Sequence, residues 1–160
     1  MPKVKSAFLD FVRCVVNGEI DAVSRHLVAR PSFATAPSDV GATRQDASTF
    51  FFSEIAHYLY VGDTALHMAA AAFRRSVAEL LVAHGADCRA KNRRGAEPLH
   101  YAADANHWDP TAQAETIGCV RRQRVSGLES CSSERPANQR LKKIPERPAR
   151  ISLAIRFALG

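Results

Sequence analysis

Histidine and cysteine are the side chains of this sequence with the widest chemistry, because they can serve as metal ligands, nucleophiles or proton-transfer groups. His67 and His100 stand out, since they lie 33 residues apart at the same position of a repeated segment. The remaining members of the two groups are His26, His57, His84, His107, Cys14, Cys88, Cys119 and Cys131. Their spacing matches no zinc-binding pattern, and no two cysteines form a CxxC pair. A metal site is therefore a poor explanation of these residues.

Motifs for other chemistries are absent from the sequence. It contains no glycine-rich phosphate loop, no nucleophile elbow and no arrangement of paired carboxylates. The sequence thus favours a protein that is not an enzyme and that uses no catalytic residue, cofactor or metal.

The repeated segment itself is the strongest signal in the chain. Residues 62–70 read GDTALHMAA and residues 95–103 read GAEPLHYAA, so that Gly, Leu, His and two Ala are in register. Between them, residues 78–87 read AELLVAHGAD. Self-similarity at a period of 33 residues indicates stacked helical units, and stacked-repeat proteins mostly bind other proteins rather than catalyse.

Local sequence signals predict the helices that position these repeats. In the complete unit, Thr64 can cap a first helix, a second helix is expected over 76–84, and Gly85 fits the left-handed position that ends it. In the next unit, Pro98 suits the first position of a helix, and residues 111–120 are expected to form its outer partner.

A helical hairpin is predicted at the N-terminus. Residues 6–17 and 19–29 are joined by Asn17-Gly18, which breaks the first helix. Apolar residues of the second helix are expected to face inward, and these are Ile20, Val23, Leu27 and Val28.

A stretch between the hairpin and the first complete unit interrupts the repeats. Residues 31–45 are rich in Pro, Ser, Ala, Gly and Thr and are predicted to form a loop. Residues 46–60 are apolar and are predicted to form a helix that docks on the neighbouring repeats as an insertion. The apolar side chains that favour this helix are Phe50, Phe51, Phe52, Ile55, Tyr58 and Leu59.

Charge divides the chain into two regions. Residues 1–117 hold 12 Lys and Arg against 13 Asp and Glu, whereas residues 118–160 hold 10 Lys and Arg against 3 Glu. The formal net charge of +6 therefore arises in the C-terminal region. From residue 121 onward there is no helical period and an excess of Arg, Ser and Pro, which is typical of poorly ordered chains. Only residues 151–159 are apolar enough to suggest a short helix or strand.

No apolar run approaches the ~18 residues that a membrane-spanning helix needs, and the charged N-terminal stretch makes a poor signal peptide. We therefore expect a cytoplasmic protein whose cysteines are reduced thiols. We also expect it to be a monomer.

The repeated blocks resemble ankyrin repeats. The residues that carry the resemblance are TALHMA at 64–69, LLVAHGAD at 80–87 and PLHYA at 98–102. The resemblance is strong over 62–104 and implies an all-α, ankyrin-type helical solenoid with a helical insertion and a disordered C-terminal tail. The implied domain is an ankyrin repeat domain over 1–120, followed by a basic tail over 121–160. Its parts are an atypical repeat at 6–34, an insertion at 35–61, a repeat at 62–94 and a partial repeat at 95–120.

The resemblance also implies a function, which is non-catalytic protein–protein interaction as a binding module or adaptor. Thr64 and His67 would form the hydrogen-bonded start of the inner helix, and residues 89–94 would lie on a finger that projects toward the partner. The residues implied to bind the partner, an unidentified protein, are Met68, Arg89, Lys91, Asn92, Arg93, Arg94, Tyr101 and Asp104.

The sequence departs from the family pattern at several positions. Glu97 stands where the family usually has Thr, which weakens the expected helix cap. Arg89 and Asn92 replace the usual Asn and Asp, which makes the finger more basic. The finger is then either a solvated loop or a contact for an acidic partner. Tyr101 and Trp108 are either interface anchors or packing between repeats.

Two alternative functions depend on the C-terminal region. Its ten basic residues would attract nucleic acid or another acidic surface, although Phe157 is its only aromatic residue. The second alternative is a truncated or frameshifted fragment of a longer ankyrin protein without independent function. It is motivated by the abrupt loss of the repeat pattern near residue 118, where an outer helix has started normally at Ala112.

The frameshift hypothesis predicts that another reading frame of the encoding DNA restores the repeat. Translation of all three frames from codon 110 onward would then give Gly-Ala-Asp followed by a Pro-Leu-His-x-Ala block. If no frame restores these blocks, the basic region is genuine and the hypothesis is wrong.

Overall fold

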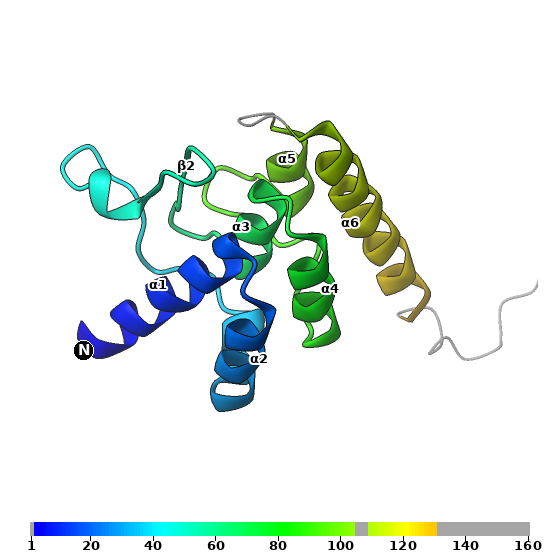
Figure 1. Ribbon diagram of the computed structural model, residues 1–160, viewed down its shortest axis with the longest axis horizontal. Helices are drawn as coiled ribbons and strands as arrows, with labels where there is room; N and C mark the ends of the chain where they lie inside the picture. The colour runs from blue at the N-terminus through cyan, green and yellow to red at the C-terminus, as the bar shows by residue number, and fades with distance from the viewer. Residues whose placement is uncertain (1, 105–108, 131–160) are drawn as a thin grey trace, which may run out of the picture.

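The computed structural model describes residues 2–104 and 109–130, which form three pairs of helices stacked in a row (Figure 1). The pairs are α1 (Pro2–Asn17) with α2 (Ile20–Ala29), α3 (Ala65–Ala71) with α4 (Arg75–Ala83), and α5 (Pro98–Ala103) with α6 (Pro110–Ser130). Helix α3 packs between α1 and α5, and α4 packs between α2 and α6. The stack therefore has an inner layer of α1, α3 and α5 and an outer layer of α2, α4 and α6.

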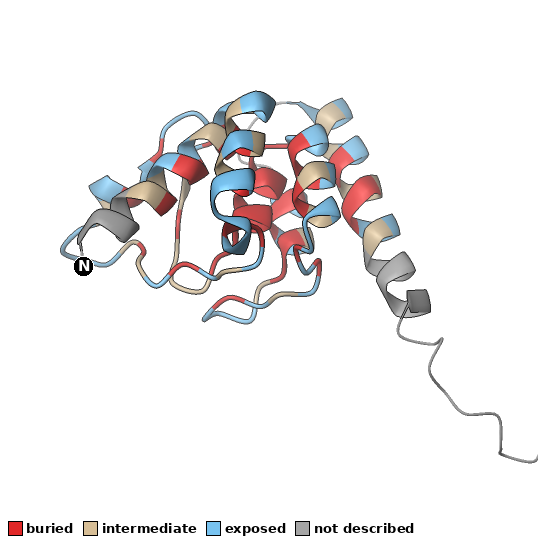
Figure 2. Cartoon of the chain, turned by 90° about the horizontal axis from the view of Figure 1, so that it is seen from below, coloured by how far each residue is buried: buried red, intermediate tan, exposed pale blue. Residues whose placement is uncertain are grey.

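The middle helix of the inner layer is buried along its whole length. All seven residues of α3 are buried, because other helices cover this short helix on several sides. Ala69 and Ala70 have no exposed surface, and their small side chains let the neighbouring helices approach closely. The buried residues of Figure 2 gather in the central helices and continue into the flanking pairs as one core.

The N-terminal pair forms as predicted, with one difference in the orientation of α2. Val23 and Leu27 are buried, whereas Ile20 is 43% exposed and Val28 is 78% exposed. The expectation that all four face inward is wrong for Ile20 and Val28. Val23 and Leu27 are four residues apart and share the buried stripe of the helix, but Val28 is turned about 100° away from Leu27.

The predicted insertion helix over 46–60 is also wrong, because this stretch forms a short hairpin. A 3-10 turn at Ser48–Phe50 leads into β1 (Phe51–Phe52), which pairs antiparallel with β2 (His57–Tyr58). Burial alternates along the first strand, with Phe50 and Phe52 buried and Phe51 exposed between them. A period of two residues is that of a strand. The helix was predicted from the number of apolar residues, which does not distinguish a helix from a strand.

The base of the insertion is tied to the finger-like turn that enters α3. Gly62 N–H donates to the Ser38 carbonyl at 2.8 Å, and Ser38 N–H donates to the Asp63 carbonyl at 2.7 Å. Ala42 N–H donates to the Leu59 carbonyl at 2.8 Å. A Cβ at Gly41 would collide with the backbone of Tyr60 and Val61, so only glycine allows this close approach.

Helix α6 extends beyond the predicted outer helix over 111–120. It continues to Ser130 and therefore crosses the position at which the sequence pattern fails. Cys119 and Val120 are buried, and Gln113 Nε2 donates to the Ala102 carbonyl at 3.1 Å. The absence of a helical period after residue 120 did not end the helix, because the following residues contain no proline and include good helix formers.

Several sequence-based expectations lie outside the described residues. These concern Trp108 as an anchor, residues 131–160 of the basic tail, and the short element over 151–159. Within the described ranges, no helix combines the length and the apolar composition that a membrane crossing requires.

Leu81 tests how strongly this short stack depends on its core. Its side chain is fully buried in α4, so replacement by Ala should lower the free energy of unfolding by about 2–5 kcal/mol. The measurement is urea denaturation followed by circular dichroism. The matched control is Leu80→Ala in the same helix, where the side chain is only half-buried. Equal losses from the two variants would contradict the assignment of Leu81 to the core.

Candidate functional site

The finger between α4 and α5 is shaped by the side chain of Asn92. Its Oδ1 accepts hydrogen bonds from the backbone N–H groups of Arg94, at 2.9 Å, and Ala96, at 3.0 Å. Asn92 N–H also donates to the Ala96 carbonyl at 3.0 Å, and Gly95 has a φ of 79° in the turn. Asn92 is buried, so these bonds are shielded from water and fix the conformation of the fingertip.

A buried carboxylate connects this finger to the rest of the stack. Asp63 has no exposed surface, and its Oδ1 accepts from Asn92 Nδ2 at 2.9 Å and from the Tyr101 hydroxyl at 2.8 Å. Its Oδ2 accepts from Tyr60 N–H at 2.7 Å. Burial and the neighbouring Asp63 charge raise the pKa of Tyr101, so its hydroxyl remains protonated and keeps donating. One side chain thus joins the insertion, the finger and α5.

His67 forms the start of α3, as the family resemblance implied. Its Nδ1 accepts from Thr64 N–H at 3.1 Å and lies 2.9 Å from Thr64 Oγ1. Because Nδ1 accepts, Nε2 carries the proton, and it donates to the Ala96 carbonyl at 3.0 Å. The buried imidazole therefore links one repeat to the finger of the next. Burial lowers the pKa of His67 below its ordinary value of 6.5.

Glu97 replaces Thr without loss of the cap. The Glu97 carboxylate accepts from His100 N–H, and His100 Nδ1 accepts from Glu97 N–H at 2.9 Å, so the capping box is complete at the start of α5. The expectation that Glu97 weakens the cap is wrong, because its carboxylate reaches the same N–H that a threonine hydroxyl would.

Three of the predicted partner-binding residues are buried inside the stack. Met68 has no exposed surface, Tyr101 is 6% exposed and Asn92 is 6% exposed. Met68 lies in α3 between its neighbouring helices, while Tyr101 and Asn92 bind Asp63. Their predicted role as partner contacts is corrected accordingly, since a side chain that holds adjacent repeats together cannot also reach a partner.

The basic residues of the finger are exposed, unlike Met68, Tyr101 and Asn92. The exposed side chains of the finger, called here the basic finger, are Arg89, Lys91, Arg93 and Arg94. The Arg94 guanidinium carbon lies 4.1 Å from the centroid of the Tyr60 ring, a cation–π geometry. Asp104 is also exposed, but it caps the C-terminal end of α5, whereas the finger enters α5 at its N-terminal end. The structure does not bring Asp104 together with the basic finger.

Sequence reasoning missed an aromatic surface next to the basic finger. Phe51 and Tyr58 pair across the hairpin with ring centroids 4.8 Å apart, and Tyr58 and Tyr60 are 6.2 Å apart. Phe51 is 42% exposed and the two tyrosines are half-buried. The strand-like alternation through Phe50 and Phe52 was the signal that could have placed Phe51 on the outside.

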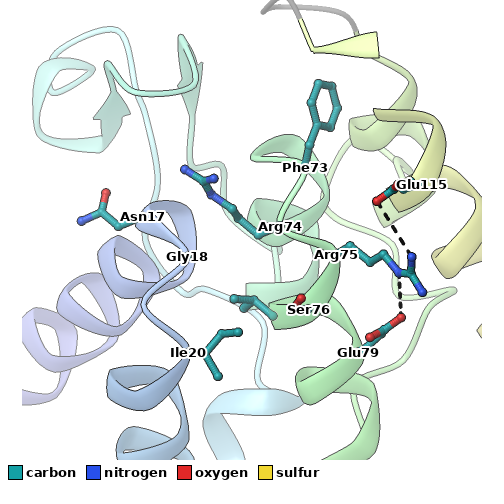
Figure 3. A pocket seen from close by; sticks show the side chains of 10 residues that line it. Asn17, Gly18, Ile20, Phe73, Arg74, Arg75, Ser76, Glu79 and Glu115 are labelled. Carbon is teal, nitrogen blue, oxygen red and sulfur yellow. Dashed lines mark hydrogen bonds and ion pairs between the residues drawn. The ribbon is translucent and has the colours of Figure 1, made fainter. Parts of the chain in front are cut away.

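A groove lies at the opposite ends of the inner helices, between the α1–α2 and α3–α4 turns and α6 (Figure 3). Its volume is about 500 Å³. Arg75 pairs there with Glu79 at 2.9 Å and with Glu115 at 3.9 Å, and Arg74 Nε donates to the Val16 carbonyl at 2.9 Å. The contacts with Glu115 and Val16 join different helix pairs, whereas the contact with Glu79 lies within α4. The opposite charges leave the groove without a concentrated charge.

Comparison with known protein families identifies the family to which this repeat architecture belongs. The sequence pattern described as "Ankyrin repeats (3 copies)" matches residues 11–110, which is more than half of the chain. The chain belongs to the ankyrin-repeat family. No curated protein matches it. Ankyrin repeats are generally protein–protein interaction modules, and their domains are typically non-catalytic.

Metal ligands and reactive thiols do not define a site in the described part of this ankyrin-repeat protein. In residues 2–104 and 109–130, no group of three His, Cys, Asp or Glu side chains is arranged to hold a metal ion. Cys14, Cys88 and Cys119 are free thiols there. Burial raises the pKa of Cys88 to about 11 and also raises that of Cys119, which disfavours the reactive thiolate.

The hydrogen bonds of His67 predict a pH-dependent stability. In the unfolded chain His67 takes up a proton below pH 6.5, whereas the folded imidazole resists it. Its contribution should therefore be complete above pH 6.5 and should fall as the pH is lowered below that value, by at most about 1.4 kcal/mol per pH unit. Urea denaturation between neutral and mildly acidic pH measures the slope.

His67→Gln should be less stable at neutral pH but should show a flatter pH profile than the unaltered protein. His84→Gln, at an exposed position after α4, is the matched control and should keep the original slope. An unchanged slope in His67→Gln would show that other groups cause the pH dependence.

Proposed function

We propose that this ankyrin-repeat protein is a non-catalytic binding module that engages an acidic protein partner through the basic finger. The observation that carries the proposal is the placement of Arg89, Lys91 and Arg93 as exposed side chains on a backbone fixed by buried Asn92. A solvated loop would not need a buried amide and a buried carboxylate to hold its shape.

Charge at the fingertip supports an acidic partner. Residues 88–96 contain four basic residues and no acidic one. The finger is flanked by exposed Asp87 and by Glu97, whose carboxylate is only 8% exposed and is used in the α5 cap. The positive charge therefore gathers at one place in a region whose overall charge is close to zero, and such a patch steers an acidic partner toward its docking position.

Rigidity of the finger supports binding rather than a spacer role. The finger is held from two sides, because Asp63 accepts from the Asn92 side-chain amide and the Val61 carbonyl accepts from Arg93 N–H at 3.3 Å. A loop that is already ordered loses little conformational entropy on binding, so more of the interaction free energy appears as affinity.

We also propose that the repeat domain continues to Ser130 rather than ending at residue 120. Helix α6 packs against α4 and α5 in the place of an outer helix, and its Cys119 and Val120 are buried. The third repeat would then have both of its helices.

The charge of the finger is tested by Arg89→Glu combined with Arg93→Glu. Arg94 is left intact because its contact with Tyr60 gives it a structural role. Peptides selected from a random display library on the full chain should bind the double variant at least about tenfold more weakly, mostly through slower association, with a steeper loss at low salt. Surface plasmon resonance at two salt concentrations measures both effects.

Arg13→Glu combined with Arg25→Glu is the matched control, with the same change of charge on the exposed surface of the N-terminal pair. It should leave binding of the selected peptides unchanged, as should deletion of residues 131–160. If the control or the deletion weakens binding as much as the finger variant does, the finger is not the binding site. Equal thermal unfolding temperatures show that the variants remain folded.

A further inference from the structure

The hairpin of the insertion carries an aromatic surface that is partly exposed. The aromatic row consists of Phe51, Tyr58 and Tyr60, which lie on one side of the strands, while Phe50 and Leu59 fill the core from the other side. Phe51 is 42% exposed. The Phe51 ring packs on Tyr58 across the strands, and its exposed part adds to the neighbouring tyrosines as contact area for a partner.

The aromatic row is continuous with the basic finger. Tyr60 packs under the guanidinium of Arg94 at 4.1 Å, and Arg93 N–H donates to the Val61 carbonyl at 3.3 Å. The His57 ring contacts the Tyr101 ring in a tilted arrangement, with centroids 4.7 Å apart, and so anchors β2 to the inner layer. In Figure 1 the segment with β2 lies beside the inner helices α1 and α3. The hairpin and the finger therefore present one surface, with rings at one end and cations at the other.

This surface has the two components of a peptide-binding interface. Aromatic side chains provide large contact area at small conformational cost, and arginines at the edge supply charge and hydrogen-bond donors. The hairpin adds one exposed acidic residue, Glu54, which lies in the turn at the far end from the finger. Complementarity therefore requires a ligand that is apolar where it meets Phe51 and acidic where it meets Arg93.

We propose that the aromatic row and the basic finger together bind an acidic segment of another protein, with an aromatic or bulky aliphatic side chain of that segment seated on Phe51 and Tyr58. The inference rests on the proposed function and deepens it by naming the chemistry of the partner. The protein segment is favoured over single-stranded nucleic acid because ankyrin repeats are generally protein–protein interaction modules.

The experiment uses the same random peptide library, displayed and selected on the full chain, with binding of the recovered peptides measured on variants. The enriched peptides should combine acidic residues with at least one aromatic or large aliphatic residue. Phe51→Thr keeps a β-prone residue and should weaken their binding at least about tenfold. Tyr58→Thr should weaken it as well, which provides a second, independent variant.

Val28→Thr is the matched control, because Val28 is an even more exposed apolar residue on the distant helix α2. It should not change binding, and thermal unfolding of all variants shows whether the hairpin substitutions leave the stack intact. If Phe51→Thr unfolds the protein, the Tyr58→Thr measurement decides the question. Unchanged binding in folded Phe51 and Tyr58 variants overturns the inference.

Two further outcomes separate this inference from the proposed function. Acidic peptides that depend on Arg89 and Arg93 but not on Phe51 would overturn the aromatic contact and leave the proposed function standing. If neither the Arg89 and Arg93 variant nor the Phe51 variant weakens peptide binding, both proposals are overturned. Failure of the selection to enrich acidic peptides would also overturn both. A single-stranded oligonucleotide is tested in parallel, and binding that exceeds the peptides and requires Phe51 would replace the protein segment with nucleic acid.

Discussion

The buried carboxylate of Asp63 is the interaction on which the arrangement of this stack depends. A charge without exposed surface is tolerated only when its oxygens are fully hydrogen-bonded, and Asp63 achieves this with Tyr60, Asn92 and Tyr101. These partners come from three different segments of the chain. Each segment can satisfy the carboxylate only in one position, so the insertion, the finger and α5 are placed relative to one another by a single group.

His67 adds a second tie across the same junction. It joins the start of α3 to the Ala96 carbonyl of the following finger, next to the Asn92 turn. The basic finger is exposed, yet the residues that hold it in place, Asp63, His67 and Asn92, are buried and polar. The protein thereby keeps a rigid surface without relying on surface ion pairs, which contribute little to stability.

The sequence predicted the repeated part of the fold well and the insertion poorly, for a physical reason. Thr64, His67 and Gly85 act through local hydrogen bonds and backbone conformation, and Gly85 has the expected φ of 88°. Such signals depend only on residues that are close in the sequence, so they can be recognised without the structure. Met68 and Tyr101 were misplaced because a position on an inner helix does not reveal whether the next repeat covers it.

The hairpin depended on contacts that lie far apart in the chain. Phe50, Phe52 and Leu59 are buried only because the insertion folds back onto the stack, and His57 is held by Tyr101 from the next repeat. A rich supply of apolar residues is compatible with a helix or a strand, and tertiary contact decided between them. Tertiary contact also explains helix α6. Its packing at Cys119 and Val120 supports a helix that continues to Ser130, although the sequence pattern ends near residue 120.

The closed base of the insertion has an evolutionary consequence. Ser38 hydrogen-bonds to Gly62 and Asp63, so the two ends of the inserted segment meet at the edge of the stack. Residues between such ends can change in length with only a small entropic cost, which grows slowly with loop length. The tip of the insertion can therefore change in sequence and length, and with it the ligand preference, while the helices of the stack stay the same.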